Sequence, residues 1–141
     1  MTANTADMAG TITLVQASWV KVKSIGSEAA TLFYQNLFIS NPELRPLFKG
    51  DLRQQGVRLM QMLDFAIGKL TDLDTLAPVL QKLGQRHGGY GVKPAHYDLV
   101  GAALLQTLEQ GLGRDFTDET RAAWSTVYGL VARTMMAGSA G

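Results

Sequence analysis

Several features are missing from this sequence, and each absence excludes a class of protein. It has no cysteine, which excludes disulfide bonds and thiolate metal sites. No apolar run reaches the roughly 18 residues of a transmembrane helix, and Met1–Ile12 lacks the basic start and apolar stretch of a signal peptide. The 13 basic and 12 acidic residues nearly balance, so charge gives no reason to expect binding to nucleic acid or an anionic membrane. We therefore expect a cytoplasmic protein without either partner.

Strand signals are also scarce. The chain shows no sustained alternation of apolar and polar residues and no Asn-Gly or Asp-Gly hairpin turn. Apolar residues instead recur with helical spacing and make up 46% of the 141 residues. This pattern predicts an all-α fold of seven or eight helices, two of them short. We expect one domain over residues 1–141, with Met1–Ile12 as a flexible N-terminal extension.

Capping residues, glycine and proline indicate where these helices begin and end. Thr13 and Thr117 are suitable N-cap residues, and Asn41-Pro42 suits the start of a short helix that ends near Phe48. Gly88-Gly89 should stop the helix that carries His87. The expected helices are about 13–23, one that follows Gly26-Ser27 and ends near 38, 42–48, 52–70, a segment ending just after residue 87, 94–111, and one from residue 117 onward.

The chain has two histidines. His87 continues the apolar stripe formed by Leu76, Leu80 and Leu83 at the end of its helix, and taken alone such a residue is more often a buried structural histidine than a ligand. His96 follows Pro94 at a helix start and is expected to be exposed. The helix break between the two histidines prevents them from forming a zinc pair by helical spacing.

Two polar side chains fall at apolar positions. Tyr34 lies among Phe33, Leu37 and Phe38, and Gln55 lies on the helix face that continues through Leu59. Tyr34 on its own could be a core tyrosine whose hydroxyl finds a backbone carbonyl. Gln55 on its own could be a partly solvated residue near a helix start. Both residues would be satisfied if they faced a shared cavity that holds a polar guest.

Several segments together resemble a known family. Leu32–Phe38, Asn41-Pro42 and Phe48 are similar to the second and third helices of a globin. Leu83–His87, followed by Tyr90-Gly91-Val92 and Ala95-His96-Tyr97, resembles the proximal helix and the following turn of bacterial globins. The resemblance covers about Thr13 to Met136 and is strongest to single-domain bacterial haemoglobins and the haem domain of flavohaemoglobins.

The resemblance implies a globin fold around non-covalent haem b and gives each matching residue a role. His87 is similar to the proximal iron ligand, whose second ring nitrogen should donate to a backbone carbonyl or another acceptor. Tyr34 and Gln55 match the residues that hydrogen-bond the gas ligand, and Leu59 matches the apolar residue above it. Phe48, Leu83 and Val92 match residues that pack against haem. Because cysteine is absent, only coordination and packing could hold the haem.

Tyr97 matches a tyrosine beneath the proximal histidine. In flavohaemoglobin-like proteins this tyrosine works with a glutamate of the last helix to make the histidine more electron-donating. The expected glutamate position falls near Ser139 in this chain, so the resemblance implies a weaker effect here. It also implies a separate reductase, because the chain ends where a flavin and nicotinamide reductase would begin.

Three functions follow from these observations. The first is reversible oxygen binding, used for oxygen supply or for oxidising nitric oxide to nitrate, with oxygen, nitric oxide and carbon monoxide as ligands. The second is a haem-based gas or redox sensor that acts through a partner protein. The third is a helical bundle without haem, in which His87 is structural.

Overall fold

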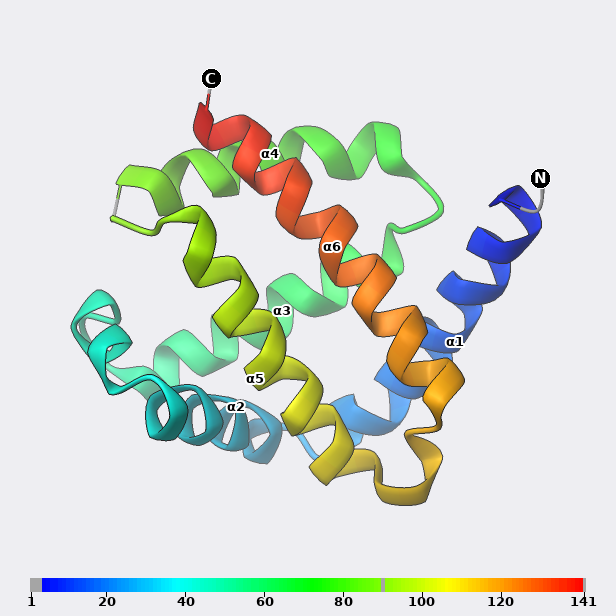
Figure 1. Ribbon diagram of the computed structural model, residues 1–141, viewed down its shortest axis with the longest axis horizontal. Coiled ribbons are helices and arrows are strands. Elements are labelled where there is room, and N and C mark those ends of the chain that lie inside the picture. Colours follow the sequence, from blue (N-terminus) through cyan, green and yellow to red (C-terminus); the bar gives the residue numbers. More distant parts are fainter. Residues whose placement is uncertain (1–3, 90, 141) are drawn as a thin grey trace.

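The computed structural model describes residues 4–89 and 91–140 and is built from helices (Figure 1). No strand occurs within those ranges, which confirms the predicted all-α class. In the described residues there are six α-helices and two 3₁₀ helices: α1 (Asn4–Ser24), α2 (Ser27–Ser40), η1 (Pro42–Leu47), α3 (Leu52–Gly68), α4 (Leu73–Gly89), α5 (Pro94–Leu112), η2 (Gly113–Asp115) and α6 (Asp118–Ala140).

The first helix begins earlier than the sequence suggested. We expected it to start at Thr13, and this boundary is wrong, because α1 begins at Asn4 and includes most of the segment expected to be an extension. Thr13 is not a cap, since its hydroxyl donates to the Ala9 carbonyl at 2.9 Å, one turn back within the helix. Ile12 packs against the core, which gives this part of α1 a tertiary contact.

The other boundaries lie close to their predicted positions. Pro42 is the first residue of η1, and the helix of His87 ends at Gly89. Thr117 caps α6 as predicted, because its Oγ1 accepts a hydrogen bond from the Thr120 N–H at 3.1 Å. Asp51, which was not recognised as a cap, accepts from the Arg53 N–H at 2.9 Å at the start of α3.

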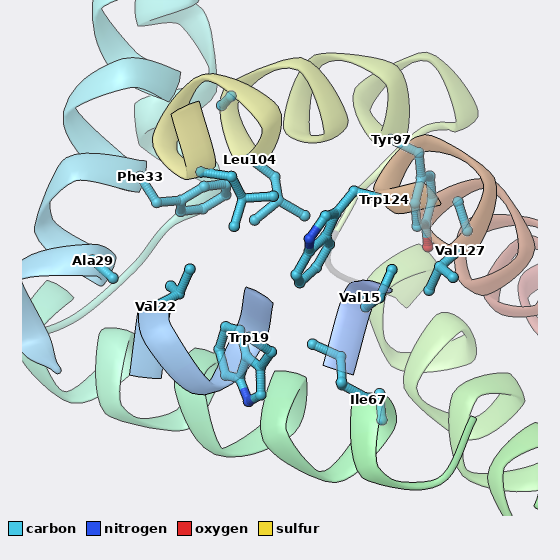
Figure 2. Close-up of a cluster of buried hydrophobic side chains, with 14 of the residues drawn as sticks. Val15, Trp19, Val22, Ala29, Phe33, Ile67, Tyr97, Leu104, Trp124 and Val127 are labelled. Carbon is cyan, nitrogen blue, oxygen red and sulfur yellow. The ribbon is translucent and has the colours of Figure 1, made fainter. Parts of the chain in front are cut away.

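The buried core draws side chains from all six α-helices, and α6 packs against α1, α4 and α5 while α2 packs against α5. Figure 2 shows Trp19 and Trp124 within this cluster, and their ring centroids are 6.3 Å apart. Both indole nitrogens have partners: Trp124 Nε1–H donates to Ser18 Oγ at 2.8 Å, and Trp19 Nε1–H donates to Asp64 Oδ1 at 2.9 Å. The second bond connects α1 to α3. It also helps, together with Lys23, to hold the pKa of Asp64 below its usual value.

The helices α4 and α6 approach each other at two glycines. A Cβ atom at Gly84 would lie 1.8 Å from the Met135 carbonyl oxygen, and one at Gly138 would lie 2.1 Å from the Gln81 carbonyl oxygen. Backbone atoms oppose both glycines, so no side-chain rotation could make room for a larger residue. The two helices cross in Figure 1, and this crossing fixes the helix that carries His87 against the last helix.

A search of the described residues for a bilayer-spanning helix finds none that combines the necessary length and apolar character.

Candidate haem site

His87 lies half-buried near the end of α4 and is oriented by the main chain. Its Nδ1 lies 2.8 Å from the Leu83 carbonyl oxygen, one turn earlier in the same helix. A carbonyl can only accept a hydrogen bond, so in the neutral imidazole Nδ1 carries the proton and Nε2 keeps its lone pair. This is the tautomer that a metal requires, and the predicted hydrogen bond of the second ring nitrogen is present.

His96 is engaged elsewhere. The expectation that it is exposed is wrong, because it is half-buried at the start of α5. Its Nδ1 accepts a hydrogen bond from the Lys93 backbone N–H at 2.9 Å, so the side chain serves as part of the helix cap. This role accounts for the half-burial and leaves His87 as the stronger candidate for a ligand.

Tyr34 is buried within a group of aromatic rings. Its ring centroid lies 5.3 Å from Phe33, 5.6 Å from Phe48 and 6.0 Å from Phe38. Burial raises the pKa of Tyr34, an effect that the nearby Arg58 partly offsets. The phenol therefore keeps its proton at neutral pH and can donate a hydrogen bond. Within the described residues its hydroxyl makes no hydrogen bond.

Gln55 points to the loop that precedes α3. Its side-chain Nε2 donates to the Lys49 carbonyl, and the side chain is half-buried. The loop turns at Gly50, whose φ of 86° belongs to the left-handed region that favours glycine. The structure therefore does not join Tyr34 and Gln55 by a hydrogen bond, although both residues lie on the helices predicted to carry them.

The four apolar residues assigned to the haem environment share one property. Each is half-buried and packs against the core from a different part of the chain: Phe48, Leu59, Leu83 and Val92. Val92 is fixed relative to His87, because the Val92 N–H donates to the His87 carbonyl at 3.0 Å. Half-exposed apolar side chains, two of them on residues that contact His87, fit a flat, apolar, metal-containing group such as haem, which would cover them.

Tyr97 has a buried hydroxyl with no partner among the described residues. Its side chain is 8% exposed and belongs to the cluster in Figure 2, and burial raises its pKa. The backbone carbonyl of Tyr97 accepts a 2.6 Å hydrogen bond from the Tyr128 hydroxyl. The pKa of Tyr128 is raised as well, first by burial and then by Tyr97 and Asp98. Tyr90, named in the globin-like motif, and the Ser139 side chain lie outside the described residues.

Two arginines near Tyr34 were not recognised from the sequence. Arg45 contacts Phe38 and Phe48, and Arg58 is close enough to Tyr34 to affect its pKa. Arg58 directly precedes Leu59, and Arg45 lies three residues before Phe48. This closeness in sequence to Leu59 and Phe48 could have drawn attention to the two arginines. Exposed arginines are common, however, and nothing else in the sequence distinguishes these two from the others.

A surface hollow of about 600 Å³ lies between α4 and the end of α6. It is lined by Pro78, Val79, Gln81, Lys82, Gln85, Ala137 and Gly138. None of the residues assigned to haem or its gas ligand lines this hollow, so we do not associate it with the candidate haem site.

An all-helical fold that carries a main-chain-oriented imidazole near half-buried apolar side chains fits a class of helical proteins that hold a cofactor through one histidine. The Globin family model matches residues 31–135, and the chain therefore belongs to the globin family. Membership of this family implies haem binding, and the matched segment includes every residue assigned to the site.

Relatives of this chain include flavohemoproteins from two bacteria. The Bacillus cereus protein is 32% identical over 127 residues, which cover 88% of this chain and 31% of that protein. The Bordetella parapertussis protein is 34% identical over 123 residues, which cover 84% of this chain and 30% of that protein. The chain thus spans about a third of the length of these relatives.

Two solved structures share the fold. A bacterial globin from Campylobacter jejuni superimposes with a TM-score of 0.81 at 24% identity and covers 94% of this chain and 96% of its own. A hexacoordinated heme protein from an anhydrobiotic tardigrade superimposes with a TM-score of 0.85 at 16% identity, covering 94% and 95%. At these identities the likeness supports the globin fold alone.

Proposed function

We propose that this protein holds haem b non-covalently through Nε2 of His87 and binds oxygen reversibly beside Tyr34. The observation that carries the proposal is the 2.8 Å contact between His87 Nδ1 and the Leu83 carbonyl, which selects the metal-binding tautomer. When bound, haem would supply the iron that binds a diatomic gas. Phe48, Leu59, Leu83 and Val92 would exclude water from it.

Tyr34 is proposed as the donor that favours oxygen over carbon monoxide. A bound oxygen ligand carries partial negative charge, and carbon monoxide carries less. The buried phenol stays protonated because burial raises its pKa, so it can donate to that charge. Such a hydrogen bond contributes on the order of 1–3 kcal/mol in a low-dielectric pocket. This corresponds to roughly a 5- to 150-fold slower release of oxygen.

We further propose that the oxygen complex is used to remove nitric oxide, with oxygen supply as the alternative use. One nitric oxide, one dioxygen and one electron give one nitrate, so every turnover would require one electron from a reductant. The named relatives are flavohemoproteins, and this chain matches about a third of their length. The resemblance to flavohemoproteins supports a flavin-dependent reductase as the electron source.

The proposal is tested by two measurements on haem-loaded protein. An oxygen titration of the ferrous form should give a reversible oxy spectrum that returns on removal of the gas. Stopped-flow addition of nitric oxide should then produce stoichiometric nitrate and a ferric spectrum. Rapid oxidation in air without a stable oxy form would contradict oxygen binding. Sustained turnover on addition of a reductase system would separate an enzyme from a sensor, which needs only a change of haem state.

A further inference from the structure

Arg45 makes two different contacts with the aromatic group around Tyr34. Its guanidinium Nη1 donates to the Phe48 carbonyl at 2.7 Å. Its guanidinium carbon lies 5.6 Å from the centroid of the Phe38 ring, a cation–π distance. The backbone adds a third link, because the Phe48 N–H donates to the Arg45 carbonyl at 3.0 Å. The exposed Arg45 side chain on η1 thus contacts both Phe38 of α2 and Phe48, the residue that follows η1.

Arg45 contacts the ring of Phe38 and the main chain of Phe48, and the rings of both phenylalanines pack against Tyr34. Phe38 and Phe48 pack edge-to-face with their centroids 5.2 Å apart. Tyr34 stacks on Phe38 at an interplanar angle of 13° and meets Phe48 at 74°. A shift of either phenylalanine would therefore change the space that the Tyr34 ring occupies. Tyr34 has no hydrogen bond of its own within the described residues to resist such a shift.

The geometry points to Arg45 as a positioning residue for Tyr34: by fixing Phe38 and Phe48 from outside, it holds the phenol where it can donate to the ligand. This inference rests on the function proposed above. It assigns to Arg45 an effect on oxygen, transmitted through Tyr34, although Arg45 itself lies on the surface. An arginine suits this task because its planar group can stack on a ring and donate to a carbonyl at the same time.

The test is Arg45→Ala, compared with Arg121→Ala as a matched control. Arg121 is also exposed, lies 5.3 Å over the Phe116 ring and pairs with Glu109, far along the chain from Tyr34. Oxygen dissociation should be about two- to fivefold faster in Arg45→Ala, with carbon monoxide dissociation changed less, and Arg121→Ala should match the parent. Arg45→Lys keeps the charge without the planar fork and should give an intermediate rate.

Repeating Arg45→Ala in a Tyr34→Phe background distinguishes an effect through the Tyr34 hydroxyl from a merely structural role of Arg45. If Arg45 acts through the Tyr34 hydroxyl, the added effect on oxygen dissociation should disappear there. An equal acceleration in both backgrounds, or none in either, would overturn the inference while leaving oxygen binding by the parent intact.

A measurement that does not require haem completes the design. Amide hydrogen exchange at Phe48 should be about two- to fivefold faster in Arg45→Ala than in the parent or Arg121→Ala. If the parent takes up no haem, the proposed function fails. Faster amide exchange at Phe48 in Arg45→Ala would still show that Arg45 holds this part of the chain in place. Unchanged exchange at Phe48 would overturn the inference.

Discussion

The regions around His87 and Tyr34, which we propose as the two walls of a haem site, are built in different ways. On the His87 side, the imidazole is fixed by a backbone carbonyl, and its helix is fixed by backbone contact between Gly84 and Met135. On the Tyr34 side, the key residues are held by side chains: the phenol by a group of rings, and Gln55 by the loop carbonyl of Lys49. Main-chain geometry thus sets the position of the proposed iron ligand, whereas side-chain packing sets the position of the proposed gas donor. Changes on the first side should affect haem retention and folding, and changes on the second should affect ligand rates.

The largest expected effect is that of His87→Ala. With no cysteine in the chain and His96 engaged in a helix cap, no other histidine or thiolate can replace the lost iron bond. We expect stable haem retention to be abolished, measured as the ratio of Soret to protein absorbance after gel filtration. His96→Ala is the control and should retain haem. Full retention in His87→Ala would remove this residue from its assigned role.

The next largest effect is expected from replacing a glycine by alanine, and it should differ between Gly84 on the His87 side and Gly56 on the Tyr34 side. Gly84→Ala would place a Cβ 1.8 Å from a backbone oxygen, so we expect it to lower the free energy of unfolding by about 3 kcal/mol or more. Gly56→Ala would place a Cβ 3.0 Å from Ala30 Cβ and 3.6 Å from Tyr34 Cε2. There the gain in helix propensity, about 1 kcal/mol, offsets the crowding. Urea unfolding would measure both, and equal losses would contradict the difference between the walls.

Tyr34→Phe should change oxygen release without changing folding. The substitution keeps the ring and its packing and removes the hydroxyl, so oxygen should dissociate roughly 5- to 150-fold faster. Carbon monoxide dissociation should change far less. Displacement of oxygen by carbon monoxide in a stopped-flow instrument gives the rate. A parent-like rate would mean that the hydroxyl does not reach the ligand.

Gln55→Leu should accelerate oxygen release less than Tyr34→Phe does, because the Gln55 amide is bonded to the Lys49 carbonyl. If both groups reach the ligand they belong to one network, and the double variant should be slower than the product of the two effects predicts. The same stopped-flow experiment on both single variants and the double variant tests this. A larger effect for Gln55→Leu would reverse the assignment of the main donor.

The smallest expected effect is that of Tyr97→Phe. The Tyr97 hydroxyl has no partner among the described residues, so removing it should alter the ferrous iron–histidine stretching frequency only slightly. Resonance Raman spectroscopy provides the measurement. A large drop in that frequency would mean that the hydroxyl does make His87 more electron-donating, together with a further hydrogen-bond acceptor.

Much of the fold could be predicted from local patterns. Helical spacing, the Asn41-Pro42 start and the Thr117 cap are short-range signals, and the corresponding helices occur where expected. The start of α1 was missed because no local signal distinguishes the residues before Thr13 from a frayed chain end. Ile12 packs against the core, and the sequence pattern does not reveal such a long-range contact.

The site was predicted less completely, for the same physical reason. The hydrogen bond of His87 to Leu83 follows from helical spacing, since the two residues are one turn apart. The direction of the Gln55 side chain depends on a loop, and the roles of Gly84 and Arg45 depend on contacts with other helices and with rings. Such contacts leave no periodic trace in the sequence.

The central claim, that His87 holds haem and that oxygen binds opposite it, is tested most directly by absorption spectra. The purified protein would be given one equivalent of haem and recorded in the ferric, ferrous, oxygen-bound and carbon monoxide-bound states. The account predicts a sharp Soret band at one haem per chain, a ferrous form that binds both gases, and an oxy spectrum that reverses when oxygen is removed. Haem that elutes apart from the protein, or a ferrous spectrum that neither gas changes, would contradict it.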